Sequence, residues 1–129
     1  MKAKTLLLAC LCVLCLTTTG ETTGETTDPP TGAEQILLQG LLDLNAGLND
    51  VEAYVDDNYV YVSFHRNFGN VSISLYNPNG LIVYSDVVNT AVQQLVVIPI
   101  TGFVDGVYTI VLENATGYAD GDFEKNSNN

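Results

Sequence analysis

The sequence predicts an all-β protein that folds as one antiparallel sandwich or barrel of about seven to eight strands. Three observations lead to this class. Apolar and polar residues alternate with period two in several short runs, which is typical of half-buried strands. Turn-forming groups such as Asp-Asp-Asn at 56–58 and Asn-Phe-Gly-Asn at 67–70 separate these runs. The runs recur about every ten residues, which favours hairpins over alternating helices and strands.

The first 20 residues have the layout of a secretory signal peptide. Lys2 and Lys4 precede an apolar run of about a dozen residues, which is shorter than the roughly 20 that cross a bilayer. We therefore expect export to the periplasm, the cell surface or the medium, with no transmembrane segment. Cys10, Cys12 and Cys15 all lie in this segment, so the exported chain would have no disulfide. A lipoprotein-like box ends at Cys10, but cleavage there would leave an apolar run below the usual length.

Residues 21–32 predict a disordered Thr/Pro-rich tether, 33–125 the β-sandwich domain and 126–129 a disordered tail. Loss of residues 1–20 would leave 109 residues, in which Arg66 and Lys125 face 15 acidic residues. The resulting formal charge of −13 (2 − 15) repels nucleic acid and anionic membranes, and we exclude both as partners.

Eight strands are predicted, at 35–39, 51–55, 59–65, 71–76, 81–88, 95–100, 107–113 and 118–124. Their alternation turns one set of apolar side chains toward the core, namely Val60, Val62, Phe64, Val71, Ile73, Leu75, Tyr108, Ile110 and Leu112. The hairpin over 71–86 turns at Asn-Pro-Asn-Gly. Pro78 presets φ there, and Gly80 can adopt the left-handed conformation. We interpret this hairpin as scaffold without a functional role.

The leucine-rich segment over 36–48 is open to two interpretations. Ile36, Leu37, Leu41, Leu44 and Leu48 fit one stripe of a helix. Gly40 and Gly47 oppose a helix by about 1 kcal/mol each. We predict a short strand over 35–39 followed by a loop, with a short helix as the alternative.

Several runs together resemble the secreted Bacteroides-type proteins of the domain of unknown function 3244 family. These runs are ILLQG at 36–40, VEAYVDDNYVYVSF at 51–64, GNVSISLYNPNGLIVYSDVV at 69–88, VVIPI at 96–100, GVYTIVLEN at 106–114 and GDFE at 121–124. The resemblance implies an immunoglobulin-like β-sandwich behind a signal peptide, and it implies no established activity. NPNGLIVYS and GVYTIVLEN also resemble the C-terminal sorting domains of type IX secretion. Such domains follow a large cargo, and only a short tether precedes this one.

Two groups of oxygen ligands suggest weak calcium binding. Asp120, Asp122 and Glu124 stand at alternate positions, and the other group is Asp56, Asp57 and Asn58. Calcium takes 6–8 oxygen ligands, often from neighbouring loops. Neither group has the full calcium-loop pattern, and a solvated strand face explains the first as well. We assign no cofactor.

Two sets of residues are candidates for binding a partner. Leu41, Leu42, Leu44 and Leu48 exceed what a solvated connector needs, and we expect weak self-association or a protein contact through residues 39–50. Tyr59, Tyr61 and Tyr76 are predicted on outer faces, where tyrosines can contact a protein or a glycan.

The sequence indicates no catalytic site. Ser63 and His65 share a predicted strand face with Arg66 next to them, but no nucleophile elbow accompanies them. The composition and pattern therefore favour an exported, non-catalytic β-sandwich that acts as a binding or structural module. The alternatives are a self-associating or partner-docking subunit that uses the segment 36–48, and a sorting-type domain.

Export has a direct test. N-terminal sequencing of the protein from its native host should begin within a few residues of Glu21, because the small residues near position 20 form the cleavage site. A retained Met1 would contradict export, and a lipid on Cys10 would replace cleavage at position 20 with an anchored form.

Overall fold

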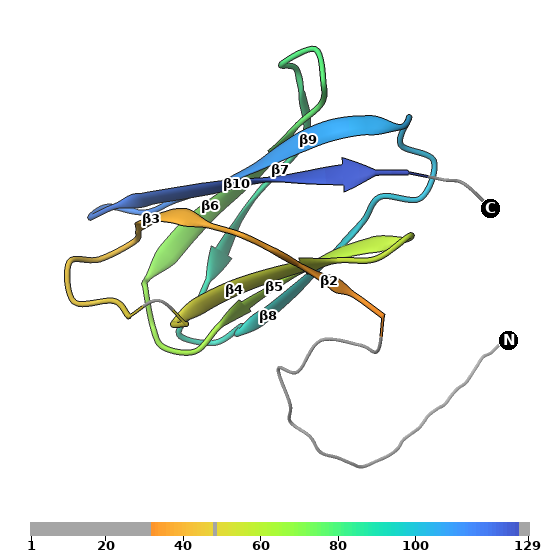
Figure 1. Cartoon of the computed structure of the whole chain (residues 1–129). Coiled ribbons are helices and arrows are strands. Elements are labelled where there is room, and N and C mark those ends of the chain that lie inside the picture. The colour runs from red at the N-terminus through yellow and green to blue at the C-terminus, as the bar shows by residue number, and fades with distance from the viewer. Residues whose placement is uncertain (1–31, 48, 127–129) are drawn as a thin grey trace, which may run out of the picture.

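The computed structural model describes residues 32–47 and 49–126, which form two facing antiparallel sheets without a helix (Figure 1). The strands are β2 (Glu34–Ile36), β3 (Gln39–Leu41), β4 (Val51–Val55), β5 (Tyr59–Phe64), β6 (Asn70–Tyr76), β7 (Ile82–Asn89), β8 (Leu95–Pro99), β9 (Gly106–Glu113) and β10 (Tyr118–Lys125). The all-β prediction is confirmed. The predicted signal peptide, most of the tether, Leu48 and the last three residues lie outside the described residues.

One sheet has the order β3-β10-β9-β6-β7, and the other has the order β2-β4-β5-β8. All neighbouring strands are antiparallel, and the hairpins β4–β5, β6–β7 and β9–β10 each stay within one sheet. In the described part of the chain, no helix is long and apolar enough to cross a membrane.

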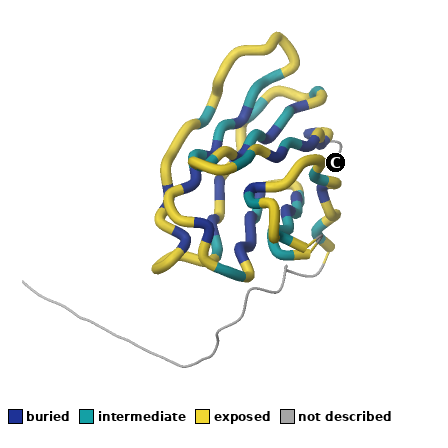
Figure 2. The backbone as a smooth tube through the Cα atoms, turned by 90° about the vertical axis from the view of Figure 1, so that its left-hand side faces the viewer, coloured by how far each residue is buried: buried dark blue, intermediate teal, exposed yellow. Residues whose placement is uncertain are grey.

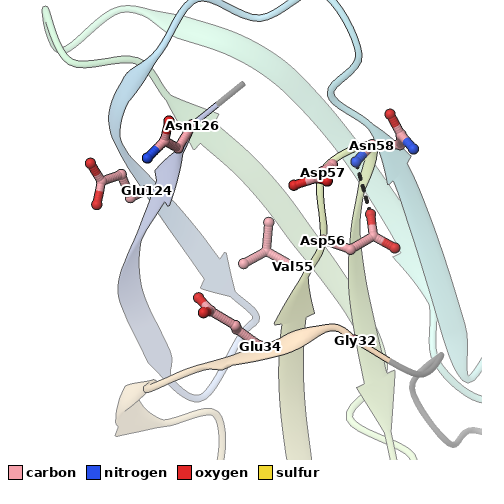
Figure 3. Close-up of a pocket in the computed structure, with 8 residues that line it drawn as sticks. All are labelled: Gly32, Glu34, Val55, Asp56, Asp57, Asn58, Glu124 and Asn126. Atoms are coloured by element: carbon pink, nitrogen blue, oxygen red, sulfur yellow. Dashed lines mark hydrogen bonds between the residues drawn. The ribbon is translucent and has the colours of Figure 1, made fainter. Parts of the chain in front are cut away.

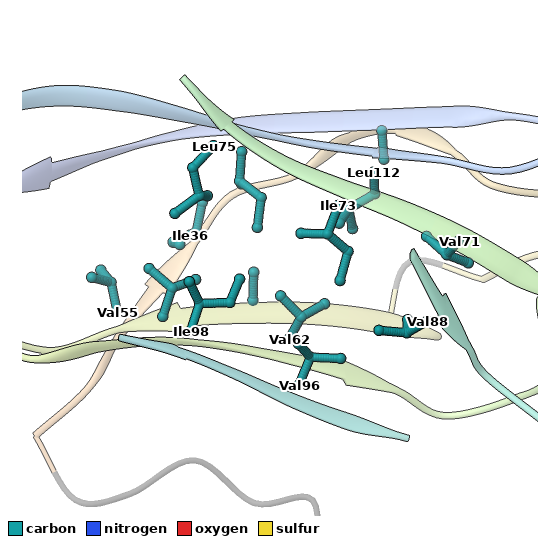
Figure 4. Packing of buried hydrophobic residues seen from close by; sticks show 14 of the residues in the cluster. Ile36, Val55, Val62, Val71, Ile73, Leu75, Val88, Val96, Ile98 and Leu112 are labelled. Carbon is teal, nitrogen blue, oxygen red and sulfur yellow. The ribbon is translucent and has the colours of Figure 1, made fainter. Parts of the chain in front are cut away.

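The core lies between the two sheets and follows the predicted alternation (Figure 4). The side chains of Val60, Val62, Phe64, Val71, Ile73, Leu75, Ile110 and Leu112 are completely buried. Figure 2 shows buried and exposed positions alternating along the strands. Because the described residues contain no cysteine, this apolar contact holds the sheets together without a disulfide.

Tyr108 anchors one end of this core. Its ring stacks between Phe103 and Phe123, with ring centroids 5.4 and 5.6 Å apart. Its hydroxyl donates a 2.7 Å hydrogen bond to the carbonyl of Val104, four residues upstream. Such a corner tyrosine lets a large side chain be buried while its polar group stays bonded.

The leucine-rich segment forms two short strands in different sheets, which corrects the prediction of one strand over 35–39. β2 pairs with β4, and β3 pairs with β10. Figure 1 shows this segment crossing from one layer to the other. We call residues 34–42 the strap, because they form the edge of both sheets on the same side of the sandwich. The alternative of a helix over this segment is wrong among the described residues.

Glycines on both sides make room for the strap. A Cβ on Gly121 would lie 2.5 Å from the Leu37 carbonyl oxygen, and one on Gly117 would overlap the carbonyl of Leu41. Gly40 has φ +98° and faces the backbone of Tyr118 equally closely. A helix in place of the strap would put side chains between its backbone and that of β10. The close approach of the two backbones leaves no space for them.

The hairpin over β6 and β7 turns as predicted. Gly80 has φ +83°, and its N–H donates to the Asn77 carbonyl at 2.9 Å. The Asn77 side chain accepts further bonds from the N–H groups of Asn79 and Leu81. β7 nevertheless buries only one of its residues, Val88, because the facing sheet ends at β8.

Replacement of Ile110 by Ala should lower the free energy of unfolding by about 2–5 kcal/mol, because it leaves a cavity between the sheets. The adjacent Thr109 is half-buried on the outer face, and Thr109→Ala should cost about 1 kcal/mol or less. Urea melts measure both values. Equal, small effects would mean that the two faces of β9 are misassigned.

Candidate functional site

The exposed side of the strap forms a continuous surface with β10. Leu41 stands opposite Tyr118 in the register, and Gln39 stands opposite Asp120. Leu37 borders a shallow hollow of about 370 Å³ together with Gln39, Asp120, Gly121 and Asp122. We call this surface the strap face and define it by Leu37, Gln39, Leu41, Tyr118, Asp120 and Asp122.

Strand alternation explains why leucines appear on this surface. Ile36 and Leu42 point inward and are 2% and 1% exposed, whereas Leu37 is 77% and Leu41 42% exposed. Leu42 follows the solvent-facing Leu41, so alternation turns its side chain into the core. Leu42 is therefore removed from the predicted partner-binding set. Leu44, in the following loop, is 92% exposed, and Leu48 lies outside the described residues.

The strap is held at its C-terminal end by a specific polar contact. Thr116 Oγ1 donates a 2.7 Å hydrogen bond to the carbonyl of Leu42, and Thr116 lies in the β9–β10 turn. The turn itself is organised by Asn114 Oδ1, which accepts from the N–H groups of Thr116 and Gly117. The strap therefore presents its exposed leucines on a fixed backbone.

Arg66 organises the loop over 43–50 that follows the strap, a role that the sequence analysis missed. Its Nη2 lies 3.0 Å from Asp43 Oδ2, and its Nη1 lies 3.6 Å from Asp50 Oδ2 and 3.1 Å from the Asn45 carbonyl oxygen. The guanidinium also sits 5.0 Å from the centre of the Phe68 ring. Because these groups are about one-third exposed, each ion pair contributes only about 0.2–1 kcal/mol. Asp43 and Arg66 are 23 residues apart in the chain, so no local sequence pattern indicates that they are in contact.

The three acids of β10 do not converge on one point. Asp122 Oδ1 accepts a 2.8 Å hydrogen bond from Thr109 Oγ1, and Asp120 lies beside Leu37 in the strap face. Glu124 instead borders a different hollow. Over residues 32–47 and 49–126, no three His, Cys, Asp or Glu side chains are grouped so that they could hold a metal ion. Calcium binding through Asp120, Asp122 and Glu124 stays a prediction.

The second hollow, of about 550 Å³, lies at the end of the sandwich where β2 begins and β10 ends (Figure 3). Its polar lining comes from Glu34, Asp56, Asp57, Asn58, Glu124 and Asn126. The structure thus brings Glu124 near the predicted Asp-Asp-Asn group and adds Glu34. Glu34 comes from β2, Glu124 from β10 and the Asp-Asp-Asn group from the turn between β4 and β5. Because these elements are distant in the sequence, spacing could not predict that they lie close together.

The carboxylate of Asp56 accepts hydrogen bonds from its own turn and is not free to bind a ligand with both oxygens. Its Oδ1 accepts from the N–H groups of Asn58 and Tyr59 at 2.9 and 2.8 Å, and its Oδ2 accepts from the Tyr61 hydroxyl at 2.7 Å. Burial acts to raise the pKa of Asp56, but these three hydrogen bonds outweigh it, so the pKa is lowered. Asp56 therefore closes the β4–β5 turn.

The three predicted tyrosines do not form one surface. Tyr59 and Tyr61 lie together on the outside of the four-stranded sheet, with ring centroids 6.0 Å apart. Tyr76 belongs to β6 in the other sheet. Tyr118, which the sequence analysis did not select, is 49% exposed in the strap face. The signal for it was its period-two spacing from Asp120.

Ser63 and His65 lie in different surroundings. Ser63 is buried at 2% exposure, while His65 Nε2 lies 3.0 Å from Glu52 Oε1. A nucleophilic hydroxyl must reach both its base and the substrate, and this arrangement does not support that chemistry.

Comparison with known proteins gives one family match and a solved structure with a similar fold. Residues 42–125 match the sequence model of the domain of unknown function DUF3244. A crystal structure at 1.70 Å of a DUF3244 family protein from Bacteroides vulgatus ATCC 8482, described as an immunoglobulin-like β-sandwich, is similar, with a TM-score of 0.65 and 17% sequence identity. The similarity covers 73% of this chain and 99% of that chain. No curated protein matches. β2 and β3 precede the first residue of the family match.

The Tyr61–Asp56 bond makes stability sensitive to high pH. Burial, followed by the hydrogen bond to the Asp56 carboxylate, raises the pKa of Tyr61 to about 12. The folded state therefore holds this proton more tightly than the unfolded chain, whose tyrosine pKa is about 10. The contribution is complete below about pH 10 and is lost as the pH rises toward 12.

Tyr61→Phe should therefore reduce the alkaline loss of stability, measured as the free energy of unfolding against pH. At neutral pH the variant should lose about 0.5–1.5 kcal/mol with the hydrogen bond. The same alkaline slope in both proteins would show that Tyr61 does not carry this effect.

Proposed function

Because the chain belongs to the DUF3244 family and folds as an immunoglobulin-like β-sandwich, we propose that it is an exported, non-catalytic module that binds another protein through the strap face. The observation that carries this proposal is the exposure of Leu37 beside Asp120 and Asp122, with the exposed Leu41 next to Tyr118 on the same face. The signal-peptide layout of residues 1–20 supports the export part of the proposal.

The exposed leucines are surplus to the core. Ile36 and Leu42 already supply the strap's buried contacts. Burying a leucine side chain is worth about 1.5–3 kcal/mol, so covering Leu37 and Leu41 favours any complementary surface. The fixed backbone of the strap reduces the conformational entropy that a partner would have to overcome.

The negative charge of the strap face favours a partner with basic side chains. Both basic residues in the described part of the chain are placed elsewhere, with Arg66 bound to Asp43 and Lys125 buried at 6% exposure. Within the described residues, Asp120 and Asp122 therefore have no cationic neighbour in their hollow. A lysine or arginine of a partner can pack its aliphatic stem on Leu37 and place its charge near these carboxylates. Two copies of the strap face would instead bring like charges together.

The rest of the described surface supports a binding role over catalysis. Ser63 is buried, His65 contacts Glu52, and Asp56 closes a turn, so these three groups have structural roles. Binding modules on sandwich folds need only a rigid framework and an accessible face.

A comparative pull-down from native envelope extract tests the proposal. The wild-type protein should capture a basic partner, and Leu37→Ser with Leu41→Ser should reduce the capture at least about tenfold through lost apolar contact. Asp120→Asn with Asp122→Asn should weaken it as well. High salt should also weaken it, because screening removes the charge attraction.

The matched control is Val92→Ser, since Val92 is 81% exposed but distant in the fold, between β7 and β8. Thermal melts should show that all variants remain folded, because exposed substitutions usually change stability by about 0.5 kcal/mol or less. Equal capture by wild type and the leucine variant would rule out the strap face as the binding surface.

A further inference from the structure

The outer face of the four-stranded sheet carries three tyrosines on two adjacent strands. The described chain forms two layers only, so within it no third layer covers this face (Figure 1). Alternation turns Val60 and Val62 of β5 inward and leaves Tyr59 and Tyr61 outward. On β4, Tyr54 stands directly opposite Tyr61 in the register. The fold therefore brings three phenol rings to one open surface.

The neighbouring strands β2 and β8 extend this surface on both sides. Gln35 of β2 stands opposite Tyr54, and Val97 of β8 stands opposite Tyr61. Tyr59 and Val97 are 40% and 45% exposed, and the other two tyrosines are half-buried. We call this surface the tyrosine platform and define it by Gln35, Tyr54, Tyr59, Tyr61, Val97 and Pro99.

The rings of Tyr59 and Tyr61 are adjacent but not coplanar. Their centroids are 6.0 Å apart, and their planes are inclined by 54°. The face of an aromatic ring is electron-rich and attracts the C–H groups on one side of a sugar ring. Two inclined rings can contact two sugar units that are rotated relative to each other along a chain. Neither hollow described above includes these tyrosines, so the platform suits the interior of a polysaccharide more than a chain end.

Polar groups that can bond sugar hydroxyls lie beside the rings. Within the described residues, neither the Gln35 amide nor the Tyr59 hydroxyl has a hydrogen-bond partner. The amide can donate and accept, and so can the hydroxyl. The Tyr61 hydroxyl donates to Asp56 at 2.7 Å and keeps its oxygen as an acceptor. The platform thus combines apolar ring faces with the neutral hydrogen-bonding groups that a sugar requires.

The charges around the platform favour a neutral ligand. No member of the platform is charged at neutral pH. At its border, Asp56 accepts three hydrogen bonds, and Glu52 Oε1 lies 3.0 Å from His65 Nε2. Both basic residues of the described chain lie elsewhere, since Arg66 is held by the loop over 43–50 and Lys125 is buried in the other sheet. An acidic ligand would find no cation here and would be repelled by the net charge of −11.

We propose that the tyrosine platform binds a neutral polysaccharide, with sugar rings stacked on Tyr59 and Tyr61 and with Tyr54 extending the contact onto β4. Gln35 and the Tyr59 hydroxyl bond the sugar hydroxyls. This goes beyond the proposed function. It uses the outer face of the other sheet, so the strap face and the platform can fail independently.

Native affinity electrophoresis of the full chain is the first test. The gels contain hydroxyethyl cellulose, arabinoxylan or galactomannan as neutral probes, and polygalacturonate as the acidic probe. At least one neutral polysaccharide should slow the protein relative to a gel without polysaccharide, and polygalacturonate should not. Retardation by no neutral polysaccharide, or by polygalacturonate alone, would overturn the proposal.

Substitutions locate the binding surface. Tyr59→Ala should weaken the retarding interaction at least about tenfold through the lost stacking contact. Tyr61→Phe keeps the ring and should retain binding. Tyr118→Ala is the matched control, because Tyr118 is 49% exposed on the other sheet, and it should behave as wild type. Wild-type retardation of Tyr59→Ala, or equal loss in Tyr118→Ala, would overturn the assignment to the platform.

Saturation-transfer NMR of the wild-type protein keeps the proposal testable if Tyr59→Ala fails to fold. The probe is a hexasaccharide cut from the polysaccharide that retards the protein. Irradiation of the protein's aromatic protons should attenuate the sugar C–H signals, because those protons lie against the tyrosine rings. The absence of transfer would overturn stacking on the platform. Loss of a captured protein from Tyr59→Ala, without any polysaccharide retardation of the wild type, would make the platform a protein-binding surface and also overturn the proposal.

Discussion

The pairing of the strap with both sheets determines which side chains are exposed on this side of the protein. The strap bonds to β4 in one sheet and to β10 in the other, so it closes one side of the sandwich. This double pairing forces its residues to alternate between core and solvent. Ile36 and Leu42 become core, and Leu37 and Leu41 become surface. It also covers the edge of β10 from Tyr118 to Asp120, which makes these residues part of a face.

Backbone proximity is the condition for this closure. Gly40, Gly117 and Gly121 allow the strap to lie against β10 at distances that a Cβ would prevent. Each glycine lowers local strand preference, and the neighbouring apolar burial offsets this cost. The same packing leaves no space for a helix, although the leucine spacing fits one. Without a disulfide in the described domain, apolar contact and these short strand pairings carry the stability.

The two sides of the sandwich differ in chemistry. On the strap side, Leu37 lies beside Asp120 and Asp122, which have no cationic neighbour among the described residues. This chemistry suits the basic partner that we propose. On the open side, β7 has a single charged residue and a bulge at Val83, and β6 is its only neighbouring strand among the described residues.

The sequence by itself determined the all-β class, the core alternation of β5, β6 and β9, and the Asn-Pro-Asn-Gly turn, because these depend on residues close together in the chain. The spacing of polar and apolar residues records such local constraints directly. The resemblance added the family. Tertiary structure alone decided that residues 34–41 are two strands in different sheets and that Leu42 is core. It also decided that Arg66 holds the loop over 43–50, and that Glu34 and Glu124 meet at one hollow. These outcomes depend on which distant strand supplies the missing hydrogen bonds, and a local pattern carries no information about that choice.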